Sequence, residues 1–211
     1  MKNIFPNKIP IFPLNGVIYF PKTNLPLNIF EQRYLDLVND TMKSDKLMGM
    51  VQSKKNSDDV YKVGCLGKIS EFEKAKDGRV LINLTGITRF EIKGEIKNNK
   101  SYREFEVLYE KFNEDDLKSE GNLVVKPELF KHFSSKIKTF FERRGLILNW
   151  EEFKKIEQDQ QINTLAMISP VSSEEKQKLL ETKTLKDKTE ILLNIVEFYL
   201  HENCYEKKTI Q

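Results

Sequence analysis

The sequence of 211 residues is poor in cysteine and histidine, which excludes several classes of chemistry. Its two cysteines, Cys65 and Cys204, lie far apart, and neither belongs to a CxxC pair or a histidine-rich segment. A disulfide framework or a zinc site is therefore not indicated, and we expect two ordinary intracellular thiols. The two histidines, His132 and His201, fall in predicted helices, and we interpret them as helix residues rather than ligands or catalysts.

Phosphate-binding and hydrolase motifs are also missing. None of the nine glycines belongs to a G-x-x-x-x-G-K-[ST] or G-x-G-x-x-G motif, and neither H-E-x-x-H nor G-x-S-x-G occurs. No apolar run approaches the roughly 18 residues that a membrane helix requires, and the N-terminus lacks the apolar core of a signal peptide. The sequence therefore predicts a cytoplasmic protein with no cofactor, no metal and no membrane association.

An excess of charge of one sign is absent too. Lysine and arginine number 35 and aspartate and glutamate 32, which leaves a net charge of only +3. A dedicated nucleic-acid-binding domain is usually far more basic. The balance argues against nucleic acid as the partner.

The most informative stretch that is present runs from Phe20 to Tyr34, where the hydrophobic period changes. A strand is predicted by side chains that alternate, namely Leu25, Leu27 and Ile29. A helix from about 31 to 43 is predicted by side chains at helical spacing, namely Phe30, Tyr34, Leu37, Val38 and Met42. Pro21 and Pro26 lack a backbone donor and are confined to a sheet edge, a strand end or a bulge. Such an apolar edge is either protected by its prolines against pairing with further strands or a docking surface.

Further strands are predicted on both sides of this stretch. Asn15-Gly16 predicts a tight hairpin between strands at 9–14 and 17–20, and Asp77-Gly78 predicts another before a strand that begins at Val80. Other strands are expected at 47–52, around 61–73, around 90–92 after a bend at Gly86, and at 105–109. About six or seven strands with one helix are best buried as a closed or half-closed barrel.

The hydrophobic period becomes helical after a charged stretch at 113–122, which we interpret as a linker between a β domain at 8–112 and a helical subdomain at 123–205. Phe130, Phe133, Ile137, Phe140 and Phe141 form one helical stripe that ends before Gly145. Ser172 with Glu175 predicts a capping box. Other helices are expected from Trp150, around 162–168 and from about 185 to 203. This half is predicted to be a small bundle.

Charged and turn residues allow two interpretations. Glu31 and a nearby arginine, Arg33 or Arg89, would pair and clamp the helix to the sheet, or an arginine would be a recognition group. Asp77 with Gly78 is interpreted as turn chemistry. The apolar side chains around Phe20 and Leu25 are either core or a surface that stays open for an extended peptide.

Several of these motifs together resemble a known family. They are Ile9-Pro10-Ile11-Phe12-Pro13-Leu14, Phe20-Pro21, Leu25-Pro26-Leu27, Ile29-Phe30-Glu31-x-Arg33-Tyr34, Gly64-Cys65-Leu66-Gly67, Asp77-Gly78 and Gly86-x-x-Arg89-Phe90, with Pro170 and Glu175-Lys176-Gln177-x-Leu179-Leu180 further on. This order and spacing is similar to the N-terminal substrate-binding domain of the Lon (La) ATP-dependent protease family. The resemblance implies an α+β fold, with a PUA-like β pseudo-barrel crossed by one helix and then a helical bundle subdomain.

The sequence departs from the family in what it lacks. It contains neither the ATPase nor the serine-lysine protease module of Lon, so we expect a stand-alone, non-enzymatic member. Lys22 replaces a small residue and Gln32 replaces a proline that the family often has, and both are tolerable there.

We therefore predict a domain that binds exposed hydrophobic or unfolded polypeptide segments, with full-length Lon as a possible further partner. The predicted contact residues are Phe20, Pro21, Leu25, Pro26 and Tyr34. The predicted scaffold residues are Glu31, Arg33, Asp77, Gly78, Gly86 and Arg89. Two alternatives stay open, an RNA-binding PUA-like protein with steep salt dependence and an enzyme built from carboxylates such as Glu71 or Asp116. The oligomeric state is not predicted.

Overall fold

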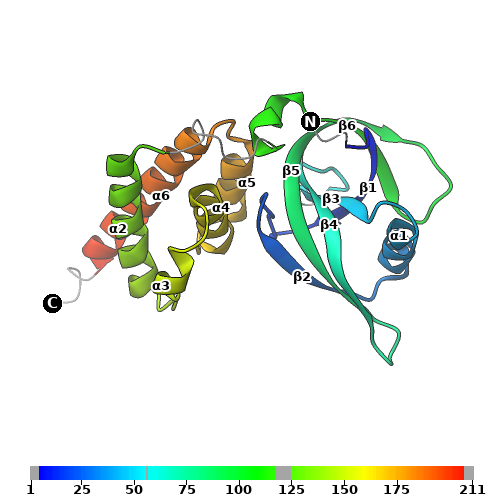
Figure 1. Ribbon diagram of the computed structural model, residues 1–211, viewed down its shortest axis with the longest axis horizontal. Coiled ribbons are helices and arrows are strands. Elements are labelled where there is room, and N and C mark those ends of the chain that lie inside the picture. The colour runs from blue at the N-terminus through cyan, green and yellow to red at the C-terminus, as the bar shows by residue number, and fades with distance from the viewer. Residues whose placement is uncertain (1–4, 56, 117–124, 207–211) are drawn as a thin grey trace. The chain divides into compact units, whose positions relative to one another are not determined.

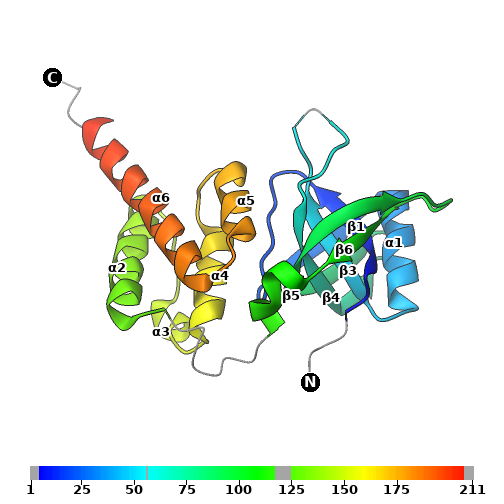
Figure 2. The ribbon, with the colours of Figure 1, turned by 90° about the horizontal axis from the view of Figure 1, so that it is seen from above.

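The structure is a computed structural model that describes residues 5–55, 57–116 and 125–206. Its internal contacts divide the chain into two compact units, Met1–Lys118 and Ser119–Gln211, which we call the barrel unit and the helical unit. The barrel unit contains the strands and one α-helix, and the helical unit contains the other α-helices (Figures 1 and 2). The predicted α+β class, with a β domain followed by helices, is confirmed.

Six strands form the sheet of the barrel unit. They are β1 (Lys8–Leu14), β2 (Asn24–Ile29), β3 (Leu47–Gln52), β4 (Val63–Lys74), β5 (Val80–Ile96) and β6 (Arg103–Leu108). Their order is β2-β5-β4-β3-β1-β6, and β6 also pairs with β5, so five of the strands close into a barrel. β2 lies outside this ring, paired with the first half of β5 (Figure 1).

β5 is one continuous strand of 17 residues, where two shorter strands were predicted. Its first half pairs with β2 and its second half with β6, and register shifts at Leu66/Gly67, Ile69/Glu71 and Ile92/Gly94 let the long strands bend around the barrel. Gly86 does not end a strand. It allows close approach, because a Cβ there would overlap the backbone carbonyl of Phe20.

The two predicted hairpins have different outcomes. Asp77-Gly78 joins β4 to β5, with Gly78 at φ 90°, so that prediction is confirmed. The hairpin at Asn15-Gly16 was wrong: residues 17–20 form no strand, and β1 pairs in parallel with β3 and antiparallel with β6. Both edges of β1 are therefore occupied, which leaves no position for a hairpin partner.

The helix α1 (Gln32–Met42) follows β2 closely, as predicted, and packs onto the barrel. Its buried face consists of Tyr34, Leu37, Val38 and Thr41. Tyr34, Leu37 and Val38 join a core cluster with Phe12 and with residues of β3, β4 and β5. The Phe12 and Tyr34 rings lie 4.2 Å apart between centroids, which ties the start of α1 to β1.

The barrel unit ends in a short 3-10 segment, η1 (Glu110–Asp116), which enters the stretch predicted as linker. Asp115 accepts hydrogen bonds from the Arg89 guanidinium at 2.7 and 2.8 Å and from the Arg89 backbone N–H at 2.9 Å. Arg89 also lies over the Phe112 ring, at 4.3 Å from the centroid. The rest of the predicted linker lies outside the described residues.

The helical unit contains α2 (Pro127–Arg143), α3 (Trp150–Phe153), α4 (Gln158–Ile168), α5 (Ser173–Glu181) and α6 (Leu185–Glu206). The predicted aromatic stripe of α2 is buried except for Phe130, and Gly145 follows the helix at φ 69°. The capping box of Ser172 and Glu175 is confirmed. The buried Lys188 ammonium, which donates to the Asn163 amide oxygen at 2.6 Å, was not predicted.

Candidate functional site

The predicted contact residues do not form one exposed surface. Phe20 is 0% exposed and Pro21 is buried, so a ligand cannot touch them in this conformation and the prediction is corrected for both. The turn before β2 fixes the backbone here: the Lys22 N–H donates to the Gly86 carbonyl, and the Gly86 N–H donates to the Thr23 carbonyl, each at 2.9 Å. This turn holds the Phe20 backbone close to Gly86 of β5.

The other three predicted contact residues lie nearer the surface. Leu25 is partly buried against the core, and Pro26 is exposed on β2. Tyr34 is mostly buried, but it lines a groove of about 740 Å³ that we call the β2 groove. The groove lies between the end of β1, the second half of β2 and the start of α1, and it includes Leu14, Leu27, Ile29 and Phe30.

Phe30 is the residue that sequence reasoning misplaced. The helical spacing put it on the apolar face of α1, whereas it lies between β2 and α1 and its side chain is 67% exposed. Large apolar side chains gain free energy when they leave water, and so an exposed phenylalanine beside a groove favours a binding role. The predicted strand already ends at Ile29 and the predicted helix begins at about 31, so the place of Phe30 between the two elements was the available signal.

Four of the five charged residues that line the β2 groove form two ion pairs. Arg33 binds Glu31 at 2.8 Å, and Arg103 binds Glu95 through two hydrogen bonds of 2.7 and 2.8 Å. The Arg103 hydrogen bond lowers the pKa of Glu95. Arg103 also donates to the Asp58 backbone carbonyl at 2.7 Å. With its charges paired in this way, the groove presents an apolar floor within a polar rim.

The backbone beside the groove belongs to an edge strand. β2 is terminal in the strand order and pairs only with β5 among the described strands. A proline inside a strand must have its missing N–H on the side away from the partner, so Pro26 removes one donor from the open edge. The edge can therefore accept only partial main-chain pairing.

Of the predicted scaffold residues, Arg89 has another partner than Glu31, whereas Arg33 forms the predicted pair with Glu31. Arg89 does not pair with Glu31; it is 2% exposed in the barrel and binds Asp115 at 2.7 Å. Glu31 and Arg33 are both about half exposed and pair with each other at the start of α1. Asp77 pairs with Arg79 at 2.7 Å within the exposed β4–β5 turn.

The family of the chain follows from comparison with known proteins. The model of the ATP-dependent protease La (LON) substrate-binding domain matches residues 8–197. The chain belongs to this family. The Lon substrate-binding domain model thus spans the barrel unit and most of the helical unit. It describes the substrate-binding domain of the protease and not a catalytic module.

Similar proteins carry the Lon name. The chain is 26% identical over 196 residues to a Lon protease of Buchnera aphidicola and 26% identical over 201 residues to one of Dictyoglomus thermophilum. These matches cover 90% and 92% of this chain but 25% and 24% of the relatives. The chain therefore spans about a quarter of the length of these proteases.

Solved structures share the fold. A Lon N-terminal domain protein from Xanthomonas campestris matches with a TM-score of 0.67 and 22% identity, covering 89% of this chain and 97% of that one. The N-terminal domain of a Mycobacterium avium complex Lon protease matches with a TM-score of 0.63 and 15% identity, covering 90% and 98%. At these identities the likeness shows the fold alone.

The next features to consider in the described part of the chain are those of a metal site, a membrane helix or an enzyme. No group of histidine, cysteine, aspartate and glutamate there is arranged to hold a metal ion, and no helix there is long and apolar enough to cross a membrane. His132 lies 3.2 Å from Glu197 on the helix surface, and His201 is exposed. Glu71 faces solvent on β4, and the Asp116 side chain lies outside the described part.

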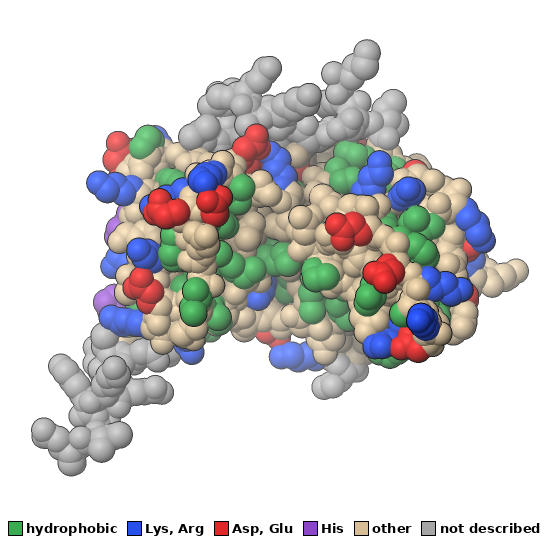
Figure 3. All heavy atoms as spheres, turned by 60° about the horizontal axis from the view of Figure 1, so that its bottom comes forward, with side chains coloured by type: hydrophobic (Ala, Val, Ile, Leu, Met, Phe, Trp, Pro, Cys, Tyr) green, Lys and Arg blue, Asp and Glu red, His purple; other side chains and the backbone are tan. Residues whose placement is uncertain are grey.

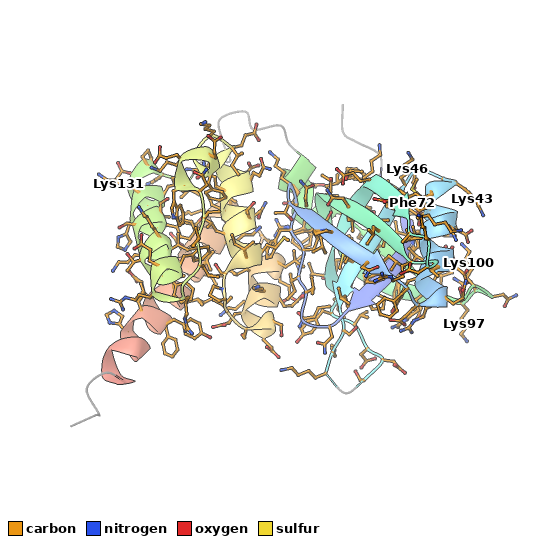
Figure 4. The ribbon with its side chains drawn as sticks, turned by 90° about the horizontal axis from the view of Figure 1, so that it is seen from below. Lys43, Lys46, Phe72, Lys97, Lys100 and Lys131 are labelled. Atoms are coloured by element: carbon orange, nitrogen blue, oxygen red, sulfur yellow. The ribbon has the colours of Figure 1, made fainter. Side chains whose placement is uncertain are left out.

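Lysines of this domain gather around α1, where Figure 4 labels Lys43, Lys46, Lys97 and Lys100. Lys43 pairs with Asp40 at 3.5 Å, and Lys100 pairs with Glu104 at 2.7 Å. Carboxylates beside the lysines lower the positive potential that an RNA backbone would need. The structure therefore adds no support for the RNA-binding alternative.

Proposed function

We propose that this Lon substrate-binding domain binds extended, apolar polypeptide segments in the β2 groove. The observation that carries the proposal is Phe30, which is 67% exposed at the rim of a groove of about 740 Å³ beside an edge strand. The family description, a substrate-binding domain of a protease, supports a polypeptide as the class of ligand. The segments bound would be those of proteins that a Lon protease degrades.

The affinity would come mainly from side-chain burial. Covering a phenylalanine contributes roughly 1.5 to 3 kcal/mol, whereas Pro26 limits how many main-chain hydrogen bonds a peptide gains along β2. Leu27 and Tyr34 would form the floor under a bound apolar side chain. Because ordering an unfolded segment opposes binding, we expect weak affinity and tolerance of many sequences.

A titration with a reduced and alkylated protein that stays unfolded tests the proposal. Phe30→Ala should weaken binding by about ten-fold, since the lost burial is worth roughly 1.5 kcal/mol. Phe198→Ala is the matched control, because Phe198 is 58% exposed on α6 in the other unit. Equal binding by wild type and Phe30→Ala, with unchanged circular dichroism, would refute the role of the groove.

A further inference from the structure

Hydrogen bonds of the turn before β2 show which main-chain groups of this strand face its open edge. The Gly86 N–H donates to the Thr23 carbonyl at 2.9 Å, so this carbonyl faces β5. In an antiparallel ladder the N–H and C=O of one residue point to the same side, and the side alternates from one residue to the next. The β2 residues whose main-chain groups face away from β5 are therefore Asn24, Pro26 and Asn28.

Two further observations agree with this alternation. Pro26 has no N–H, so it belongs at a position that donates nothing to the neighbouring strand. Asn83 lies opposite Pro26 in the register, and its main-chain carbonyl accepts a hydrogen bond from the Ser70 hydroxyl of β4 at 3.0 Å. That carbonyl thus points toward β4 and away from β2, as the alternation requires.

The open edge of β2 is accessible. Asn24, Pro26 and Asn28 are all exposed, and β2 pairs only with β5 among the described strands. The edge presents the carbonyls of all three residues and the N–H groups of Asn24 and Asn28. An extended polypeptide complements such a row, because its own N–H and C=O groups alternate with the same period.

The open edge is continuous with the β2 groove. Leu27 and Ile29 line the groove, and successive side chains of a strand point to opposite faces of its sheet. Every second side chain of a strand added beside β2 would therefore lie on the face of Leu27 and Ile29, next to the exposed Phe30. The side chains between them would lie on the face of Pro26, outside the groove. Figure 3, in which the side of the barrel unit that carries β2 is turned toward the viewer, shows hydrophobic side chains at the surface between charged ones.

We infer that a client segment binds by adding to the open edge of β2 as a further strand, with every second side chain directed into the β2 groove. This inference rests on the function proposed above and specifies the client: a segment that becomes extended and has apolar residues at alternate positions. The Asn28 N–H and carbonyl and the Pro26 carbonyl would bind the client main chain. A segment that stays helical uses its N–H and C=O groups internally and would gain none of these bonds.

A scan of N-methylated peptides tests the inference with the full chain. The probe is acetyl-Lys-Ser-Leu-Thr-Val-Thr-Leu-Ser-Lys-amide, and each variant carries one N-methyl group on a residue between the first threonine and the second leucine, both included. N-methylation removes a single donor, and only alternate N–H groups of an added strand point to β2. We expect the Kd, measured by calorimetry, to rise about five-fold for methylation at every second residue and to stay within about two-fold for the residues between. Kd values that do not alternate would overturn the inference.

Variants of β2 test the same hydrogen bonds from the protein side. Asn28→Pro removes an N–H that does not face β5, so the fold should persist and the Kd of the unmethylated peptide should rise about five-fold. Asn28→Ala keeps that N–H and is the matched control, with a Kd within about two-fold of wild type. Pro26→Val supplies the missing donor and keeps an apolar side chain, so it should lower the Kd about five-fold. If the folded Pro26→Val and Asn28→Pro variants both bind like wild type, the inference is wrong.

Phe30→Ala separates a failure of this inference from a failure of the proposed function. Weaker binding in Phe30→Ala, without alternation in the scan and without an effect of Asn28→Pro or Pro26→Val, would mean that the groove holds client side chains without strand pairing. The proposed function would then stand and the inference would fall. Unchanged binding in Phe30→Ala would refute the groove as the site, and the inference with it.

Discussion

At the scale of single residues, Phe20 and Phe30 show where sequence reasoning reaches its limit. Both are phenylalanines near strand β2. The neighbouring prolines and the family resemblance favoured Phe20 as a surface contact, with core as the alternative, whereas helical spacing placed Phe30 on the same apolar face as Tyr34. The structure reverses them, with 0% and 67% exposure. Periodicity reports which residues share a face of a regular element, but both residues lie in irregular segments, where backbone hydrogen bonds decide the direction of each side chain.

The buried pair of Arg89 and Asp115 gives the first residue-scale prediction. Asp115→Ala should lower the free energy of unfolding by about 3 kcal/mol, because the Arg89 charge stays buried without its carboxylate. Lys93→Ala is the control, since its pair with Glu106 is exposed and should change stability by less than about 1 kcal/mol. Urea denaturation measures both, and equal losses would contradict the prediction.

Buried tyrosines predict a loss of stability in alkali. Burial raises the pKa of Tyr19 and of Tyr109 above the usual range of a phenol. Above pH about 10 the unfolded tyrosines ionise while the folded ones keep their protons, so stability is fully present below that pH and falls as pH rises. The free energy of unfolding of the Tyr19→Phe variant should fall less steeply between pH ~9 and ~11 than that of the wild type, as measured by urea denaturation. An unchanged slope would contradict this account.

At the scale of elements, the pairing of strands joined by a turn of strict chemistry was predictable, and the pairing of strands distant in sequence was not. Asp77-Gly78 fixes its hairpin locally, because a positive φ at Gly78 closes the turn. Asn15-Gly16 carries a similar signal, yet β1 pairs with β3 and β6 instead. Long-range pairing overrides a local turn preference when both strand edges are needed to close a barrel.

The close approach at Gly86 predicts a position-specific effect within β5. Gly86→Ala should destabilise the protein by roughly 1 to 3 kcal/mol, because its methyl group would overlap the Phe20 carbonyl and push the turn before β2 away. Gly94→Ala, in the same strand, has open space at the Cβ position and should have little effect. Thermal denaturation compares them, and an equally stable Gly86→Ala would refute the packing role of this glycine.

At the scale of the whole molecule, the order of a β domain and a helical subdomain followed from the change in hydrophobic period. The exact extent of the domains did not follow, because η1 extends past residue 113, where the predicted linker begins. Its residue Asp115 is held by Arg89, which is 26 positions earlier in the sequence. The site was also harder to predict than the fold. Grooves form between segments that are distant in sequence, such as β1, β2 and the residues around Asp58.

The division into two units predicts independent folding of the first. A fragment of residues 1–118 should unfold cooperatively on heating, because the two core clusters described in it consist of side chains of this unit. Calorimetry with near-UV circular dichroism checks this expectation. A fragment without a cooperative transition would show that the barrel unit needs the rest of the chain.

The position of β2 has a consequence for a bound client. β2 has one partner strand, β5, among the described strands, and its residues Leu27, Asn28 and Ile29 line the β2 groove. A segment bound in the groove would cover part of β2, so β2 could separate from β5 only by giving up those contacts as well. Occupancy of the proposed site would therefore make this edge strand harder to open.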